Sequence, residues 1–137
     1  MILLDTGPIV AFFDGSDDYH DVCVEVLRGI REPLVTTWPV LTEAFYLLSY
    51  SWEAQDSLWE FIMRGGLTVA LLETETQEKC RVLMEKYRDL PMDLADGTLV
   101  AIAETMGIQR VFTLDHRDFG VYRTLDRKKF RLLPAAL

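Results

Sequence analysis

Short apolar segments alternate along this chain with longer segments of helical periodicity. Apolar residues in the longer segments recur every three or four positions, as Val22, Val26 and Ile30 do, which is the spacing of an amphipathic helix. The short segments are largely apolar throughout, and such strands must be buried on both faces. The sequence therefore predicts an α/β fold, a three-layer α/β/α sandwich with a central, mostly parallel sheet. The expected strands are residues 2–4, 34–37, 67–72, 111–114 and 130–133.

Glycine and proline residues mark the ends of several expected helices. Gly65 and Gly66 follow the helix expected at 53–63, and Gly107 follows the one expected at 93–106; both are typical C-cap positions. Pro91 interrupts the helical pattern between two further segments. The expected helices are residues 9–13, 22–31, 40–50, 53–63, 74–88 and 93–106.

Length and composition predict one domain. The chain has 137 residues, half of them apolar, which suffices for one buried core, so residues 1–137 are expected to form a single domain. No segment has the roughly 20 apolar residues that span a bilayer, and the start lacks the features of a secretion signal. We therefore expect a cytoplasmic protein without membrane contact. Cys23 and Cys80 have no CxxC companion and are expected to be reduced, buried thiols.

The net charge of −8 is unfavourable for nucleic-acid binding, which depends on Lys and Arg. The charge is unevenly distributed, however. Residues 110–137 contain seven basic and three acidic residues, a local charge of +4 on an otherwise acidic chain. This basic segment fits either contact with phosphates or a charged edge strand, since edge strands commonly carry Lys and Arg.

Four acidic residues lie where an expected strand ends or an expected helix begins. Asp5 and Asp115 directly follow strands, and Glu43 and Asp96 fall in the first turns of helices. In an open parallel sheet the carboxyl ends of the strands meet at one edge, where functional groups collect. We therefore expect these four carboxylates to face one cleft.

Four carboxylates in one cleft would require cations. Two of them about 4 Å apart repel by about 4 kcal/mol at an effective dielectric constant of 20. Mg²⁺ or Mn²⁺ suits a site made of oxygen ligands, and His20 and His116 are too few and too far apart in sequence for a zinc set. The four carboxylates therefore indicate metal-assisted phosphoryl chemistry.

Each acidic residue also has a structural explanation when it is taken alone. Asp93 fits a helix N-cap, and this is the interpretation we favour for it. Asp5 fits the cap of the turn that follows its strand. Glu43 lies in an otherwise uncharged stretch of about twenty residues, so we expect it to be buried and to need a polar partner.

Four motifs, in this order, resemble the PIN-domain ribonucleases and, within them, the VapC-like toxins of type II toxin–antitoxin pairs. They are ILLDTGPIVA at 2–11, LTEA at 41–44, MDLADGTLVA at 92–101 and VFTLDHRDF at 111–119. The resemblance covers nearly the whole chain. It implies that Asp5, Glu43, Asp96 and Asp115 hold one or two Mg²⁺ or Mn²⁺ ions and that the reaction is hydrolysis of RNA phosphodiester bonds. The supporting residues that it implies are Thr6, Asp93, Thr113 and Asp118.

The resemblance also implies partners. They are an RNA substrate, a small antitoxin that blocks the cleft, and a second copy of the chain in a homodimer. A run of aromatic residues in two consecutive helices is either core or a groove for such a partner; it comprises Phe45, Tyr46, Tyr50, Trp52, Trp59 and Phe61. The residues expected to contact RNA phosphates are Arg117, Arg123, Arg127, Lys128, Lys129 and Arg131.

Two other classes remain as alternatives. A non-catalytic PIN-like binding module would have lost metal affinity, but none of the four carboxylates is missing. A receiver-type phosphoacceptor domain opens with adjacent acidic residues and carries a lysine beyond its last strand, whereas this chain has a single Asp5 and no lysine near Asp115. A phosphatase of the haloacid dehalogenase type needs a second aspartate at the position of Gly7.

Overall fold

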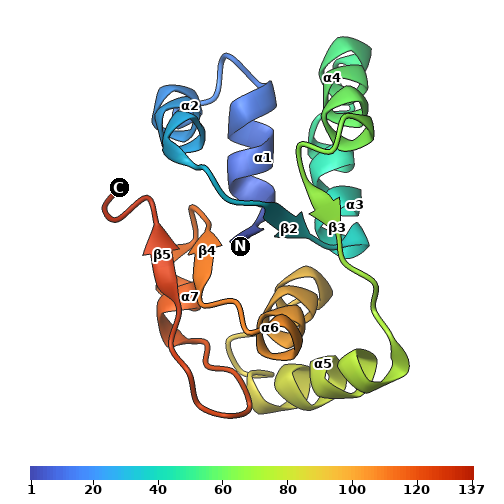
Figure 1. Ribbon diagram of the computed structural model, residues 1–137, viewed down its shortest axis with the longest axis vertical. Coiled ribbons are helices and arrows are strands. Elements are labelled where there is room, and N and C mark those ends of the chain that lie inside the picture. Colours follow the sequence, from blue (N-terminus) through green and yellow to red (C-terminus); the bar gives the residue numbers. More distant parts are fainter.

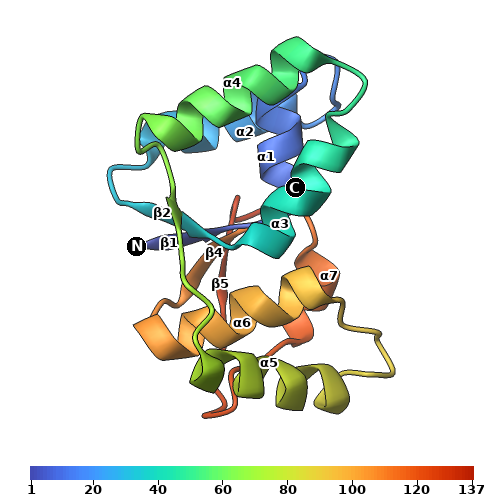
Figure 2. The ribbon, with the colours of Figure 1, turned by 90° about the vertical axis from the view of Figure 1, so that its right-hand side faces the viewer.

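A five-stranded, entirely parallel sheet forms the centre of the computed structural model, which describes residues 1–137. The strands are β1 (Ile2–Leu4), β2 (Leu34–Thr36), β3 (Thr68–Val69), β4 (Arg110–Phe112) and β5 (Arg131–Leu133), in the order β3-β2-β1-β4-β5. Figure 2 shows helices on both faces of the sheet. The predicted α/β/α fold is confirmed.

Seven helices cover the sheet (Figure 1). Helices α1 to α4 lie on one face and α5 to α7 on the other. Their bounds are α1 (Thr6–Phe13), α2 (His20–Gly29), α3 (Trp38–Leu47), α4 (Trp52–Met63), α5 (Thr74–Lys86), α6 (Leu94–Met106) and α7 (His116–Val121).

Some boundaries differ from those predicted, and side-chain caps explain two of the differences. Helix α1 begins at Thr6 rather than Ile9 because the Asp5 carboxylate accepts a hydrogen bond from the Thr6 N–H. Helix α7 was not predicted; Asp115 caps it by accepting from the Asp118 N–H. The expected strand at 67–72 is only two residues long, although the Ala70 N–H still bonds to the Thr36 carbonyl.

Helix α6 is the most deeply buried helix of the fold. Eight of its residues are buried, and it packs against α5 and α3. Gly97 permits this close approach, since a Cβ there would lie 2.9 Å from the Cys80 sulfur. Cys80 and Cys23 are both buried free thiols, as predicted.

The two edges of the sheet carry opposite kinds of charge. At the amino edge, the Met1 amino group lies 2.9 Å from Glu32, and Arg110 pairs with the same carboxylate. At the carboxyl edge, Asp5 follows β1 and Asp115 lies shortly after β4. The fold therefore separates the acidic residues of interest from the start of the basic segment. No helix combines the length and apolarity that a membrane crossing requires.

The close α5–α6 packing predicts that Gly97→Ala destabilises the protein. The added methyl group would meet the buried Cys80 side chain and the partly buried Met84 side chain, and overpacking of this kind typically lowers the free energy of unfolding by about 1–3 kcal/mol. Gly120→Ala is the matched control, because a Cβ at Gly120 meets nothing within 4 Å. Denaturant unfolding measures both variants; equal midpoints would contradict the prediction.

Candidate active site

Asp5 is a buried carboxylate directly after β1. Its Oδ1 accepts from the Thr6 N–H at 2.8 Å, and its Oδ2 accepts from the Thr113 hydroxyl at 2.7 Å. Burial raises the pKa of Asp5 to about 6, against the lowering effect of these two hydrogen bonds, and the charges of Asp115 and Glu43 raise it further. The two hydrogen bonds fix the position of a carboxylate that burial disfavours as a charge.

Thr6 and Thr113 connect Asp5 to other acidic residues, Thr113 through its hydroxyl and Thr6 through its N–H and its hydroxyl. Thr113 donates to Asp5 and accepts from the Asp115 N–H at 2.9 Å, which joins the ends of β1 and β4. Thr6 donates through Oγ1 to Glu43 at 3.2 Å, which joins the start of α1 to α3. Both threonines, which the sequence analysis named as supporting residues, thus contact the carboxylates.

Asp96 lies in the first turn of α6 and is half-buried. Its Oδ2 accepts from the Tyr122 hydroxyl at 2.9 Å. Burial raises the pKa of Asp96 to about 8, and the charges of Asp5, Asp93 and Asp115 act in the same direction, opposed only by the Tyr122 hydrogen bond. The structure thus places Asp96 within electrostatic reach of two acidic residues that lie far from it in sequence.

Asp118 lies closer to the centre of the acidic group than its predicted supporting role implied. One carboxylate oxygen from each of Asp96, Asp115 and Asp118 lies within 4.8 Å of the other two. Burial and the neighbouring charge of Asp115 raise the pKa of Asp118. Helix α7 produces this arrangement, because Asp115 caps the helix and Asp118 occupies its first turn.

The prediction that Glu43 is buried was wrong. It is exposed at the rim of the site rather than buried, because Leu41, Ala44 and Leu48 form the buried side of α3. It still has the polar partner that was expected, the Thr6 hydroxyl, and partial burial of its carboxylate together with the charge of Asp93 raises its pKa.

Asp93 is the N-cap of α6, as predicted. Its Oδ1 accepts from the Asp96 N–H at 2.8 Å, and the residue is exposed. Its charge also raises the pKa of both Glu43 and Asp96, so it acts on the acidic group as well as on the helix.

Tyr122 is a residue of the site that the sequence analysis missed. It is fully buried directly after α7, and its ring contacts Phe119 and Tyr87 edge-on, with centroids 5.2 and 5.1 Å away. Burial and the Asp96 charge raise the pKa of its phenol well above the ordinary value, so it remains a hydrogen-bond donor. A buried tyrosine needs a polar partner, but the sequence offers no periodic pattern around it that would identify Asp96.

Two of the six cationic residues expected to contact RNA lie at α7. Arg117 is exposed in the first turn, and its charge opposes the upward shift of the Asp118 pKa. Arg123 donates from Nη1 to three backbone carbonyls at the end of α7, at 2.8, 2.9 and 3.0 Å. Arg123 therefore stabilises the helix end, and Arg117 is the cation beside the carboxylates.

The other four, Arg127, Lys128, Lys129 and Arg131, lie away from the acidic group. They precede or open β5, and the neighbouring Asp126 N–H bonds to Glu104 near the carboxyl end of α6. At a rise of 1.5 Å per residue, Asp96 and Glu104, eight residues apart in α6, are separated by about 12 Å. The structure does not bring these four cations to the carboxylates, and their contact with RNA stays a prediction.

The charge of the acidic group is not balanced by cationic side chains. None of the six ion pairs includes Asp5, Glu43, Asp96, Asp115 or Asp118. Their partners are hydroxyl and amide groups, and the three clustered carboxylates offer only oxygen ligands. Such a donor set fits a hard divalent cation such as Mg²⁺ or Mn²⁺.

A family comparison agrees with this site. The family model of the PIN domain matches residues 2–124, most of the chain. The chain belongs to the PIN-domain family. The match includes all five carboxylates and both threonines of the site, and it ends before the basic residues that lead into β5.

Three similar proteins are VapC ribonucleases or toxins or a VapBC complex. Ribonuclease VapC26 of Mycobacterium tuberculosis (strain ATCC 25618 / H37Rv) is 24% identical over 135 residues, which cover 97% of this PIN domain and 100% of that protein. The crystal structure of M. tuberculosis VapC20, a sarcin-ricin loop cleaving toxin, matches with a TM-score of 0.75 at 18% identity and covers 81% of this chain and 87% of that one. VapBC2 of Rickettsia felis, bound to a DNA fragment from its promoter, matches with a TM-score of 0.69 at 17% identity, covering 96% and 98%.

The raised pKa values predict that the metal-free protein loses stability as pH rises. The pKa of Asp5 rises from 3.8 to about 6, and that of Asp96 rises from 3.8 to about 8. Between the ordinary and the raised pKa of each residue, the folded protein therefore holds more protons than the unfolded chain. The free energy of unfolding therefore falls as pH rises, and the fall ends near pH 8. Asp96→Asn is expected to raise the melting temperature in EDTA by a few degrees at pH 8 and to change it little at pH 4.

The control for this prediction is Asp56→Asn, which neutralises an exposed carboxylate of α4 and should leave the pH dependence of melting unchanged. Added Mn²⁺ should stabilise the parent more than Asp96→Asn. If the difference in melting temperature between the parent and Asp96→Asn is the same at pH 4 and pH 8, the inference that Asp96 has a raised pKa is wrong.

Proposed function

We propose that this PIN domain is a ribonuclease that hydrolyses RNA phosphodiester bonds with Mg²⁺ or Mn²⁺, and that it is the toxin of a toxin–antitoxin pair in the cytoplasm. The observation that carries the proposal is the group of carboxylates at the carboxyl edge of the sheet, which forms no ion pair with a cationic side chain. Membership of the PIN family and the likeness to ribonuclease VapC26 support it.

The residues of the site have two roles. Some would hold a cation, and the others fix the orientation of the carboxylates. Asp96, Asp115 and Asp118 would hold the ion, with Asp5 and Glu43 beside them. Such an ion would act as a Lewis acid on the phosphodiester and stabilise the charge that develops on it. Thr113, Thr6 and Tyr122 each donate to one carboxylate, so the carboxylates keep their orientation before substrate arrives.

The raised pKa of Asp96 affects cation binding. Its pKa of about 8 means that, without metal, it carries a proton at neutral pH. Cation binding must displace that proton, so the affinity for Mg²⁺ or Mn²⁺ is coupled to pH and rises as pH approaches 8. Tyr122 donates to one oxygen of this carboxylate, and one Asp96 oxygen lies within 4.8 Å of oxygens of Asp115 and Asp118.

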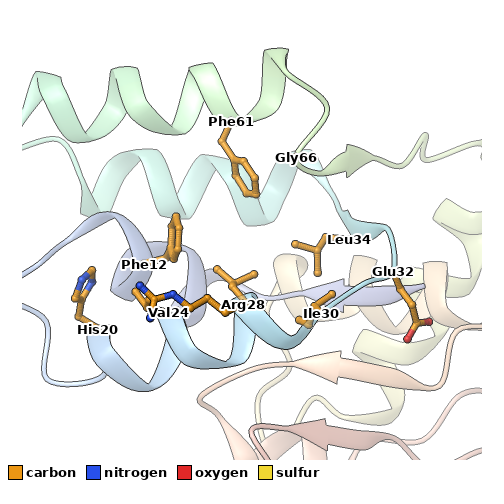
Figure 3. Close-up of a pocket in the computed structure, with 10 residues that line it drawn as sticks. Phe12, His20, Val24, Arg28, Ile30, Glu32, Leu34, Phe61 and Gly66 are labelled. Carbon is orange, nitrogen blue, oxygen red and sulfur yellow. The ribbon is translucent and has the colours of Figure 1, made fainter.

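The antitoxin is proposed to bind a cavity of about 540 Å³ between α1, α2 and α4 (Figure 3). Phe12 and Phe61 point toward one another from α1 and α4. Val24 and Leu27 of α2 also line the cavity. Arg28 and Glu32 lie at its margins. An apolar groove with charged margins fits the apolar face of an amphipathic helix.

The aromatic run in α3 and α4 is partly core and partly surface. Phe45 packs on Trp59 with ring centroids 4.8 Å apart, and Phe61 packs on Phe13 at 5.8 Å. The other three residues are exposed, Tyr46 by 75%, Tyr50 by 66% and Trp52 by 64%. We propose this exposed aromatic surface as the seam of the expected homodimer, since aromatic residues are enriched in interfaces.

The proposed activity predicts metal-dependent RNA cleavage by the purified protein. Total RNA with Mn²⁺ or Mg²⁺ should be cleaved at a limited set of sites. EDTA should abolish cleavage, and Asp96→Asn should reduce the rate by at least about a hundredfold, the order of effect expected when an oriented charge at the reacting phosphate is lost. Asp56→Asn should cleave like the parent. Cleavage by Asp96→Asn at the parental rate would contradict the proposed site and indicate a contaminating nuclease.

The proposed antitoxin groove predicts a difference between two valines of α2. Val24 lines the cavity and Val22 is exposed outside it. The chain is co-expressed with the product of the adjacent short reading frame, and a complex is isolated by an affinity tag. Val24→Asp should lower the amount of captured partner by tenfold or more, whereas Val22→Asp should not. Equal capture by both variants would place the partner elsewhere.

A further inference from the structure

Two cavities that share a wall continue the acidic site along the carboxyl edge of the sheet. The first, about 430 Å³, is lined by Glu43 and Asp93 at the acidic end and by Trp38. The second, about 460 Å³, extends past Leu72 to Arg81. Pro39 and Leu94 line both. The path follows the strand order, from the acids after β1 and β4 to Trp38 after β2 and Leu72 after β3.

Trp38 presents an aromatic surface at the first cavity. The residue is 50% exposed although it opens α3 directly beside the core. Its ring lies 6.4 Å from that of Trp59, centroid to centroid, and Pro39 follows it in the first turn of the helix, so the indole is supported. Leu94, 54% exposed, lines the same cavity. A supported, exposed indole beside a reactive centre is a surface on which a flat ring can stack.

Arg81 provides a cation at the second cavity. It is exposed on α5, and it takes part in no ion pair and no hydrogen bond. Gln77, one helical turn earlier, lines the same cavity. The groove therefore passes from carboxylates through an aromatic and apolar section to an unpaired guanidinium.

We propose that this groove binds a single-stranded segment of the RNA, with an unpaired base stacked on Trp38 and a backbone phosphate at Arg81. This inference rests on the proposed ribonuclease function and deepens it, because it assigns Trp38 and Arg81 as contacts for the strand that leads to the carboxylates. Base stacking on an aromatic ring combined with a cation on the backbone is how proteins bind single strands. A duplex would bury its base faces and leave Trp38 without a partner.

The continuity of the groove favours this occupant over a protein. Glu43 and Asp93 belong both to the groove and to the acidic group, so a molecule in the groove has its next segment at the carboxylates. Each cavity falls within the range of about 300–1,000 Å³ that accommodates small ligands, which suits one nucleotide at a time. An interface between two copies of the chain is the competing occupant.

The test begins with a single-stranded oligonucleotide that contains a cleavage site mapped with the parent protein and Mn²⁺. Trp38→Ala should raise KM roughly ten- to hundredfold with little change in kcat, the effect expected for the loss of one stacked base. Trp38→Phe, which keeps an aromatic face, should restore most of the affinity. Leu47→Ala is the matched control, since Leu47 is exposed on the same helix, outside both cavities and outside the proposed dimer seam.

An abasic nucleotide placed in turn at each position around the cleaved bond identifies the stacked base. At one position the abasic substrate should weaken the parent and leave Trp38→Ala unchanged, because that variant no longer stacks the base. Additive losses at every position would overturn the proposal. So would a parental KM in Trp38→Ala, or a loss of activity that accompanies a shift from dimer to monomer in light scattering, which would assign Trp38 to an interface between copies.

Arg81→Gln tests the other end of the groove. It should weaken binding of the oligonucleotide and reduce the slope of log affinity against log salt by roughly 0.7, the value for one phosphate contact on a single strand. Arg31→Gln makes the same charge change outside both cavities and should not. An unchanged slope in Arg81→Gln removes Arg81 from the groove. A parent that cleaves no RNA refutes the proposed function itself, which is distinct from failure of the groove.

Discussion

The gathering of like charges at one edge of a parallel sheet is the constraint on which this structure depends. Parallel strands all end at the same edge, so residues that follow β1 and β4 become neighbours although 110 positions separate Asp5 from Asp115 in the chain. The fold does not neutralise this charge with Lys or Arg. It supplies hydrogen-bond donors from Thr6, Thr113 and Tyr122, which orient the carboxylates without removing their negative charge.

This choice of donors has an energetic consequence. A guanidinium beside the carboxylates would lower their pKa values and stabilise the empty site, but it would also compete with a cation. Hydroxyl groups leave Asp5 and Asp96 with raised pKa values, so in the metal-free site the carboxylates repel one another once their protons are lost. Binding of a divalent cation would relieve that repulsion. Metal affinity and folding stability are therefore two aspects of one arrangement.

Most of the fold followed from apolar runs and helix-end residues, and the departures have specific physical causes. Helix α7 was missed because its six residues, HRDFGV, show no apolar period, and it is the Asp115 cap that starts it. Glu43 was expected to be buried because apolar residues flank it, but the period of α3 turns Leu41 and Ala44 inward and Glu43 outward. The four site acids were found from sequence position, whereas Tyr122 and the closeness of Asp118 depend on α7 and could not be.

The placement of the basic residues shows how topology decides function where composition does not. Residues that lead into a parallel strand lie at the amino edge, so Lys128, Lys129 and Arg131 are separated from the carboxylates by the length of the sheet and of α6. Cations from other elements lie nearer the carboxyl edge, among them Arg117 at α7, beside Asp118, and Arg81 of α5, which lines the second cavity. In a chain of net charge −8, the proposed groove would bring a polyanion to Arg81 and to the exposed Trp38 ring.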